Sequence, residues 1–383
     1  GWRRRALRAG AAKRRVPMKN ILRRLAVLLC LMLALALPAF AEGEKGEANI
    51  TSQTTMKELR ENPSIKGSGI YTYCQELDNP CKRIRWANST LYEFVNKYTA
   101  ADCARGLNRM IENYNNGTQI TYKVYSEAEI AEQPTCAGVE IYYFPGSQKN
   151  GKYALIIGGN ALFTSAELRE GVSTAEQLNE MGYTAFVLRY RVGWSAGENA
   201  PLEDVGHAVQ YITAHAEKFG VQAEDYALIG YSSGGQIAGL FGSDAMGWYR
   251  YGVPKPGAVM LAYAVNDFFE LQQPWKLIID PQTPDDQYHY YQLRVSDYVT
   301  PDYPPVYHWY GRNDIVLMCM NWAAQGPVLE RALVKNHVPH VEVVYDDAPH
   351  KIGPGDGTPA EGWLNDAAAF WEEQTAQAQQ PAA

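Results

Sequence analysis

The chain has 383 residues, of which 35 are basic and 42 acidic, so its formal net charge is −7. Ten of the basic residues and none of the acidic ones lie within residues 1–24, which leaves 25 basic and 42 acidic residues beyond that point, a net charge of −17. Such a balance disfavours nucleic acid and anionic membranes as partners and favours neutral or cationic ligands. It is equally consistent with a surface that is acidic for solubility alone.

Residues 1–41 have the composition of a leader. A basic stretch precedes an apolar run of thirteen residues, 25–37, and Ala39 and Ala41 form an A-x-A cleavage site, the pattern of a secretory signal peptide. The run is too short to span a membrane, and the residues before Cys30 do not form a lipoprotein box. We therefore expect translation to start at Met18, cleavage after Ala41, and release to the periplasm or medium without a membrane anchor.

Five cysteines follow this leader. Export permits disulfides, and four of the five lie within one stretch of 63 residues: Cys74, Cys81, Cys103 and Cys136. Three pairings are open, of which Cys74 with Cys81 and Cys103 with Cys136 are the simplest. Cys319 lies in an apolar segment, where we expect a buried free thiol.

Residues 42–116 are polar with short helical patches. We interpret them as an N-terminal helical extension that disulfides could staple and whose first residues form a linker. From residue 117 to about 375 the pattern changes to β-rich runs that alternate with amphipathic helices. The low-complexity residues 376–383 are expected to form a disordered tail.

The domain at 117–375 has eight expected strands. The later runs lack alternation, as strands that are buried on both faces do. Between them lie helices such as the apolar stripe from Val205 to Phe219, which ends at Gly220, and one that begins with a capping box at residues 358–361. The alternation predicts a doubly wound, mostly parallel sheet with helices on both faces. The expected strands are 120–125, 139–144, 153–157, 184–190, 226–231, 258–264, 306–310 and 341–345.

Residues 230–234 read G-x-S-x-G and stand between an apolar strand run and a helical segment. This strand, turn and helix form a nucleophile elbow in enzymes that attack through a serine. The turn is so sharp that its flanking residues must lack bulk, which accounts for Gly230 and Gly234. Ser232 is therefore the predicted nucleophile.

A serine hydroxyl needs a base within hydrogen-bond reach and an acid that orients the base. Asp314 follows the strand at 306–310, and His350 follows the strand at 341–345, so both project from the edge of the sheet that carries Ser232. Asp267 is a rival acid in a less suitable position. The other histidines are expected to be structural or, for His289, to lie in a solvated loop: His207, His215, His289, His308 and His340.

The reaction also needs backbone N–H groups that stabilise the oxyanion. The residue after the nucleophile, Ser233, should supply one of them. The second belongs to the Gly-Gly turn after the strand at 153–157, where Gly159 and Asn160 are the candidates.

With this elbow, acid, histidine and Gly-Gly turn in this order, the chain resembles the α/β-hydrolase esterases. The resemblance is to the bacterial acetylesterases and acetylxylan-esterase-like enzymes in particular, with some similarity to hormone-sensitive-lipase relatives. The resemblance implies the α/β-hydrolase fold, with Ser232 as nucleophile, His350 as base, Asp314 as acid, and Gly159, Asn160 and Ser233 as oxyanion hole. It spans residues 138–375 and rests on the segments 186–191, 201–204, 230–235, 299–305, 311–314 and 350–364.

The chain departs from these relatives at three places. Asn160 stands where relatives usually continue a glycine run, and Ile156 and Ile157 precede the turn in place of His or Pro. Lys351 follows the histidine where relatives often have Gly, which is expected to narrow the entrance. The N-terminal extension has no counterpart.

An aromatic-rich insertion at 267–304 lies between two of the later strands, where such folds build loops that cover the substrate. Aromatic faces suit stacking on sugar rings, but packing within the loop explains them equally well. The residues we expect to contact substrate are Tyr231, Trp275, Tyr288 and Tyr291.

These observations predict a secreted serine carboxylic-ester hydrolase that removes acetyl or other short acyl groups from carbohydrate or small-molecule esters, without metal or cofactor. A serine peptidase of the prolyl-oligopeptidase type is one alternative, although the propeller-sized N-terminal domain is missing. The other is a catalytically silent binding protein, for which we would expect a broken triad. No member of the triad is missing.

Overall fold

A sheet of eight strands lies at the centre of the computed structural model, which describes residues 44–70, 88–148, 151–159, 166–192, 199–267 and 293–379. The strand order is β1-β2-β4-β3-β5-β6-β7-β8. The pairs β1–β2 and β2–β4 are antiparallel, and every other neighbouring pair is parallel. The predicted doubly wound, mostly parallel sheet is thereby confirmed.

All eight predicted strands are present, and their ends shift by at most two residues. The inner strands β3, β5 and β6 are buried at every position, because helices cover both of their faces. The strands are β1 (Thr121–Lys123), β2 (Glu140–Phe144), β3 (Tyr153–Ile157), β4 (Thr184–Arg189), β5 (Ala227–Tyr231), β6 (Ala258–Ala262), β7 (Val306–Gly311) and β8 (His340–Tyr345).

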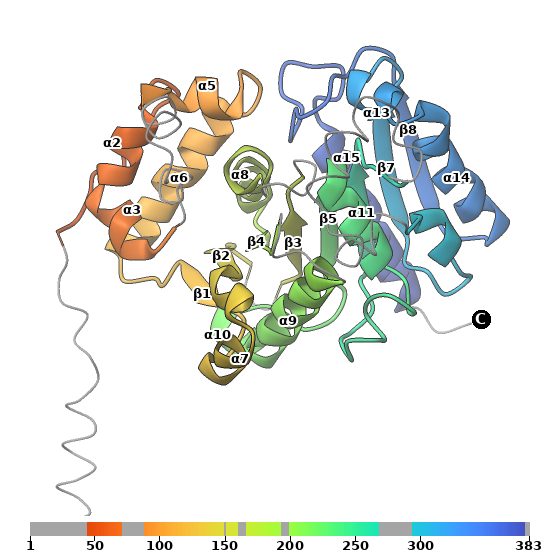
Figure 1. Ribbon diagram of the computed structural model, residues 1–383, viewed down its shortest axis with the longest axis horizontal. Helices are drawn as coiled ribbons and strands as arrows, with labels where there is room; N and C mark the ends of the chain where they lie inside the picture. The colour runs from red at the N-terminus through yellow and green to blue at the C-terminus, as the bar shows by residue number, and fades with distance from the viewer. Residues whose placement is uncertain are drawn as a thin grey trace, which may run out of the picture. The chain divides into compact units, whose positions relative to one another are not determined.

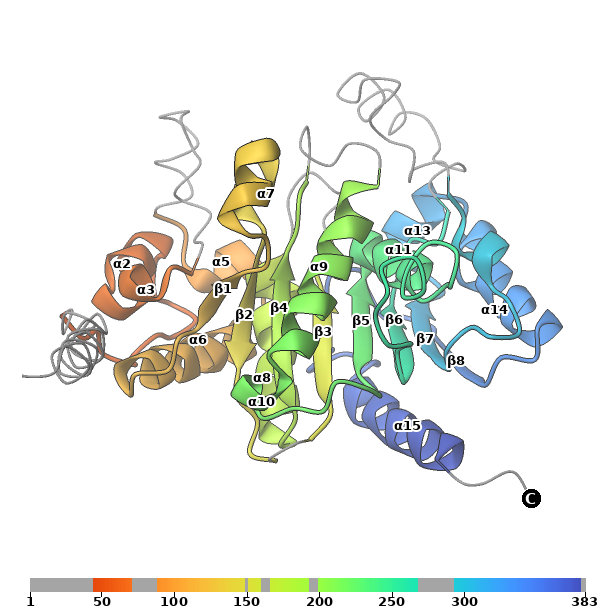
Figure 2. The same cartoon turned by 90° about the horizontal axis from the view of Figure 1, so that it is seen from below.

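The helices divide between the two faces of the sheet (Figures 1 and 2). The chain reverses direction at β3, since β4 pairs on one side of it and β5 on the other. Right-handed crossovers therefore place α8 on one face and α9, α11 and α14 on the opposite face. The bounds are α8 (Ser173–Glu180), α9 (Ala200–Ala214), α10 (Ala216–Phe219), α11 (Ser232–Phe241), α14 (Gly326–Lys335) and α15 (Trp363–Ala378).

Shorter elements connect the layers. They are α7 (Glu127–Glu132), α13 (Ile315–Cys319), the 3-10 turns η1 (Pro134–Gly138), η6 (Val295–Tyr298) and η7 (Trp322–Ala324), and a π-helix, η2 (Glu167–Val172), that leads directly into α8.

None of the helices in the described ranges combines the length and the apolar composition needed to cross a bilayer.

The residues before the sheet are helical, as predicted. They form α2 (Met56–Glu61), α3 (Pro63–Ser68), α5 (Leu91–Val95) and α6 (Ala100–Asn115), and α6 lies against α8 and η2 (Figure 1). Arg109 Nε on α6 pairs with Glu176 Oε2 on α8 at 2.6 Å. Residues from Gly46 onward accordingly form one compact unit with the sheet.

Two of the cysteine predictions need correction. Cys103 and Cys136 carry free thiols, so the predicted pairing between them is wrong. Cys103 is fully buried on the core side of α6, where burial raises the pKa of its thiol, whereas Cys136 lies in η1 beside Gln133. Cys319 is free but only half-buried. Cys74 and Cys81 lie outside the described residues, as does the predicted leader.

The last helix also differs from its prediction. It begins at Trp363 rather than at the capping box of residues 358–361, because the Thr358 hydroxyl donates to Gly355 O within a preceding turn. Gly362 precedes the helix with a φ of +86°, a conformation that glycine adopts without steric cost. α15 continues to Ala378, so the predicted tail from 376 starts as ordered helix.

Candidate active site

Ser232 lies at the junction between β5 and α11 with a φ of +51°, in the left-handed region that non-glycine residues rarely adopt. The surrounding backbone leaves no room for side chains on its neighbours. A Cβ on Gly230 would lie 2.6 Å from the Ala238 Cβ, and one on Gly234 would lie 2.3 Å from Ile157 O. The two glycines of the motif are therefore required by the sharp turn, which has the geometry of the predicted elbow.

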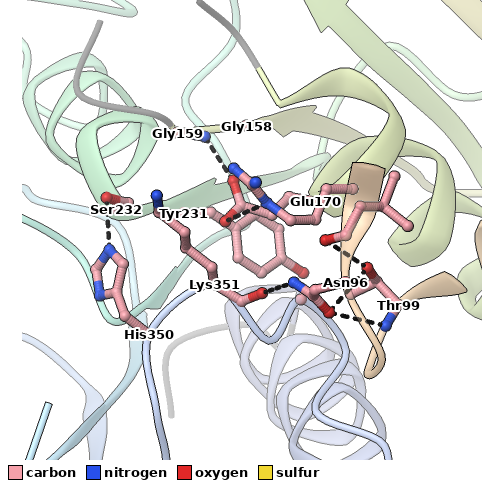
Figure 3. Close-up of polar contacts among 12 residues, drawn as sticks. Asn96, Thr99, Gly158, Gly159, Glu170, Tyr231, Ser232, His350 and Lys351 are labelled. Atoms are coloured by element: carbon pink, nitrogen blue, oxygen red, sulfur yellow. Dashed lines mark hydrogen bonds and ion pairs between the residues drawn. The ribbon is translucent and has the colours of Figure 1, made fainter. Parts of the chain in front are cut away.

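Ser232, His350 and Asp314 form a continuous hydrogen-bonded chain. His350 Nε2 lies 2.8 Å from Ser232 Oγ (Figure 3), and His350 Nδ1 lies 2.7 Å from Asp314 Oδ2. The Asp314 carboxylate accepts hydrogen bonds only, so His350 Nδ1 carries the proton between them. Nε2 then presents its lone pair to the Ser232 hydroxyl, which is the protonation pattern that activates a serine.

The Asp314 side chain is held by the helix that it starts. Asp314 is fully buried, and its Oδ1 accepts the N–H groups of Val316 at 2.9 Å and Leu317 at 3.2 Å as the N-cap of α13. These bonds stabilise the ionised carboxylate and leave its other oxygen directed at His350.

The rival residues take part in other contacts. Asp267 pairs with Arg294 Nε at 2.8 Å. His308 and His340 both contact Glu330, at 3.2 and 2.9 Å. The remaining histidines lie on other elements: His207 stacks on Tyr125, His215 contacts Tyr211 O, and His289 lies outside the described residues.

The Gly-Gly turn after β3 lies against the nucleophile, because a Cβ on Gly159 would come within 2.6 Å of the Ser232 Cβ. Its predicted role as an oxyanion donor is wrong, however, since the Gly159 N–H already donates to Glu170 Oε2 at 2.7 Å (Figure 3). Ser233 stands in the first turn of α11, where backbone N–H groups have no partner within the helix. Asn160 lies outside the described residues and stays a prediction.

Glu170, which was not among the predicted site residues, connects three parts of the site. Its Oε1 accepts the Tyr263 hydroxyl at 2.9 Å, and that hydroxyl accepts the Gly353 N–H at 3.0 Å. The fully buried carboxylate thereby links the turn after β3, the end of β6 and the loop that carries His350. A charged residue in the segment that follows a Gly-Gly turn is the sequence signal that could have indicated it.

Tyr231, predicted to contact substrate, is instead part of the core. It is fully buried in β5, and its hydroxyl lies 2.6 Å from Thr174 Oγ1 on α8. Because β5 is covered on both faces, neither side of this strand is open to a ligand. The other predicted contacts, Trp275, Tyr288 and Tyr291, lie outside the described residues.

The N-terminal helices contact the loop that carries His350. Asn96 Nδ2, at the end of α5, donates to Lys351 O at 2.7 Å (Figure 3). Gln177 Nε2 on α8 donates to Asp102 Oδ2 at 2.8 Å and to Asp356 Oδ1 at 2.9 Å. Burial, and next the nearby charge of Asp356, raise the pKa of Asp102 to about 6.

One cluster in the described part of the chain has metal-ligand chemistry. The ligand atoms of His308, Glu330 and Glu342 lie within 4.8 Å of one another on β7, α14 and β8. Glu330 is also hydrogen-bonded to the two histidines, and Glu342 accepts the Tyr310 hydroxyl at 2.5 Å. The cluster shares no residue with the Ser232 chain, which needs no metal for its chemistry.

Comparison with known proteins finds a family model and a curated enzyme that resemble part of this chain. The BD-FAE family model matches residues 139–323, which include Ser232 and Asp314. Endo-1,4-beta-xylanase B of Butyrivibrio fibrisolvens is 23% identical over an alignment of 205 residues, and the match covers 51% of this chain. The match covers 31% of that enzyme, so this chain corresponds to about a third of its length.

Solved structures share the fold at low sequence identity. A sugar hydrolase of Lactococcus lactis aligns with a TM-score of 0.53 at 19% identity, over 62% of this chain and 95% of that one. An acetyl ester-xyloside bifunctional hydrolase of Caldicellulosiruptor lactoaceticus aligns with a TM-score of 0.52 at 18% identity, over 66% and 95%. Esterase B of Lactobacillus rhamnosis, solved with a tributyrin phosphonate, aligns with a TM-score of 0.55 at 18% identity, over 68% and 86%.

The family match covers the elements from β2 to β7, and these solved structures share the α/β-hydrolase fold. The chain therefore has the α/β-hydrolase fold, and its residues 139–323, a little under half of the chain, resemble the BD-FAE family.

Proposed function

We propose that the protein is a secreted serine carboxylic-ester hydrolase that removes acetyl or other short acyl groups from carbohydrate or small-molecule esters. The observation that carries the proposal is the hydrogen-bonded chain from Ser232 through His350 to Asp314 on a strained elbow. An elbow of this kind aims the serine oxygen at a carbonyl carbon, and the histidine takes up the proton that the serine loses.

In the proposed reaction, Ser232 Oγ attacks the ester carbonyl while His350 Nε2 accepts the hydroxyl proton. The buried Asp314 carboxylate stabilises the resulting imidazolium, and the Ser233 N–H donates to the oxyanion with Asn160 as the proposed second donor. His350 then protonates the leaving alcohol, and an acyl-enzyme forms. Water attacks the acyl-enzyme with His350 as base, which releases the carboxylic acid and restores Ser232.

The preference for carbohydrate esters is supported by the relatives. Two of them are named for sugar or xylan hydrolysis, and a third is named for acting on both an acetyl ester and a xyloside. Release from the cell is supported by the composition of residues 1–41 and suits an enzyme whose substrates are extracellular polysaccharides.

The proposal is tested with protein that lacks residues 1–41, assayed on 4-nitrophenyl acetate. We expect hydrolysis that Ser232→Ala abolishes and that Ser147→Ala, an exposed position before β3, leaves unchanged. Faster cleavage of peptidyl amides than of acetyl esters would identify a peptidase instead. If no ester or amide is cleaved by protein that binds acetylated sugars, the fold serves as a binding protein. If the protein does cleave 4-nitrophenyl acetate, its rates on acetylated xylan, acetylated glucosamine and feruloyl esters identify the preferred substrate.

A further inference from the structure

Arg169 is a mostly buried cation without a hydrogen-bond partner for its Nε. Its side chain is 17% exposed, and its Nε lies 4.0 Å from Glu170 Oε1, beyond hydrogen-bond distance. Within the described ranges the guanidinium donates no hydrogen bond. Buried donors in proteins are almost always paired, so an unpaired guanidinium N–H calls for a partner that the protein itself does not supply.

Glu170 is an ion-pair partner of Arg169 at 4.0 Å but accepts no hydrogen bond from it, because both carboxylate oxygens are directed at other donors. One oxygen accepts the Gly159 N–H, and the other accepts the Tyr263 hydroxyl. The carboxylate is directed by these bonds at the turn beside Ser232 and at the end of β6. Arg169 therefore keeps donor capacity next to the nucleophile turn.

Lys351 is a second cation at the same place. It directly follows His350, and its side chain runs from the histidine loop toward Ser232 (Figure 3). It forms no ion pair with any described residue. Lys351 is exposed, yet partial desolvation by the surrounding protein, and next the neighbouring Arg169, lower the pKa of its ammonium, while Glu170 acts in the opposite direction. Geometry also places the two cations together, because a Cβ on Gly353, two residues after Lys351, would lie 3.4 Å from Arg169 O.

The backbone holds both cations in unusual conformations. Lys351 has a φ of +67°, and its carbonyl accepts the Asn96 side chain, which fixes the residue in this conformation. Arg169 lies in the π-helix η2, an element that is rare and is frequently found at functional sites. Strained and irregular backbone of this kind concentrates where a side chain must face a ligand.

From this geometry we infer that Lys351 and Arg169 bind a carboxylate of the substrate, so that the preferred substrates are anionic esters. The inference rests on the proposed function and narrows its substrate class. The carboxylate belongs either to the alcohol part, as in an acetylated uronic acid, or to the acyl part, as in the half ester of a dicarboxylic acid. In a chain with 25 basic and 42 acidic residues beyond residue 24, two cations with one shared carboxylate form a local site for an anion.

The test compares kcat/KM for matched neutral and anionic esters. One arm uses 4-nitrophenyl acetate against mono-4-nitrophenyl succinate, and the other uses an acetylated methyl glucoside against the corresponding methyl glucuronoside. We expect a preference for the anionic ester of about tenfold in one arm, carried by KM, as a charge pair in partly solvated surroundings supplies. The arm that shows the preference identifies the part of the substrate that carries the carboxylate.

Variants of Lys351 assign the preference to this site. Lys351→Met should reduce it about fivefold or more, Lys351→Arg should retain it, and the matched control Lys335→Met, on the exposed end of α14, should leave it unchanged. Equal rates for neutral and anionic esters in both arms would overturn the inference. So would a Lys351→Met variant that slows neutral and anionic esters equally, since that result would assign Lys351 to the reaction itself.

Binding measurements separate this inference from the proposed function. Calorimetry with Ser232→Ala and methyl glucuronoside or monomethyl succinate needs no turnover, and we expect binding that Lys351→Met weakens. A wild-type protein that cleaves no ester but binds these anions through Lys351 contradicts only the proposed function. A wild-type protein that cleaves neutral esters but binds neither anion contradicts only the anion site.

Discussion

Asp314→Asn is the substitution that most directly tests how the site activates Ser232. Asp314 directs one oxygen at His350 Nδ1, 2.7 Å away, and the other at the N–H groups of Val316 and Leu317. An Asn carbonyl can keep the two backbone bonds only if its amide group faces His350. That amide donates to Nδ1, which moves the ring proton to Nε2.

With the proton on Nε2, His350 can no longer accept the Ser232 hydroxyl proton across the 2.8 Å contact. Loss of the reactive tautomer lowers kcat about 10⁴-fold in serine enzymes of this design, equivalent to about 5.5 kcal/mol in the activation barrier. The α13 cap should survive, because Asn caps helices about as well as Asp. We therefore expect a large loss of kcat with little change in thermal stability.

The assay is steady-state hydrolysis of 4-nitrophenyl acetate at pH 7.5, with the unfolding temperature of each variant measured in parallel. Asp267→Asn, at the rival acid, serves as the matched control, since Asp267 pairs with Arg294 rather than with His350. A loss of kcat below about tenfold in Asp314→Asn, or an equal loss in Asp267→Asn, would refute the assignment of Asp314 as the orienting acid.

Two further predictions concern residues around the triad. Glu170→Gln keeps an acceptor for the Gly159 N–H but cannot accept the Tyr263 hydroxyl as well, so we expect kcat to fall about tenfold and the unfolding free energy to fall by about 1–3 kcal/mol; an unchanged kcat would contradict the positioning role. Folding raises the pKa of Asp102 from 3.8 to about 6, so the folded protein favours the protonated carboxyl group. The protonated Asp102 therefore contributes to stability below pH 4, and this contribution is lost as the pH rises through 6. Asp356→Asn removes the neighbouring charge, and the drop in unfolding temperature between pH 4.5 and 7.5 should become smaller than in wild type; an identical drop would show that the two carboxyl groups are not coupled.

Several features could be predicted because they depend on residues close together in the sequence. All eight predicted strands are present, and the apolar runs that lack alternation correspond to strands buried at every position in β3, β5, β6 and β7, although not in β8. The elbow was predictable because only glycine fits at Gly230 and Gly234 beside a serine with positive φ. Asp314 and His350 could be placed because the carboxyl ends of parallel strands share one edge of the sheet.

The wrong predictions concern contacts between residues that local patterns do not connect. Glu170, the partner of the Gly159 N–H, was missed because a charged residue after a Gly-Gly turn is only a weak signal and the π-helix decides where that residue points. Tyr231 was expected to contact substrate, but β5 is covered on both faces, so this side chain packs in the core against α8. The Cys103 and Cys136 pairing rested on spacing alone, which does not reveal which way a helix faces.

The sequence by itself determined the strand order along the chain, the elbow and the three residues of the hydrogen-bonded chain, because each depends on local sterics or on strand polarity. Only the tertiary structure decided what surrounds them. It joins Asn96 to Lys351 across 255 residues of sequence, and it brings Arg169 and Lys351 into one electrostatic field. Packing between distant elements sets these contacts, and the charges that select a substrate therefore emerge only when the chain has folded.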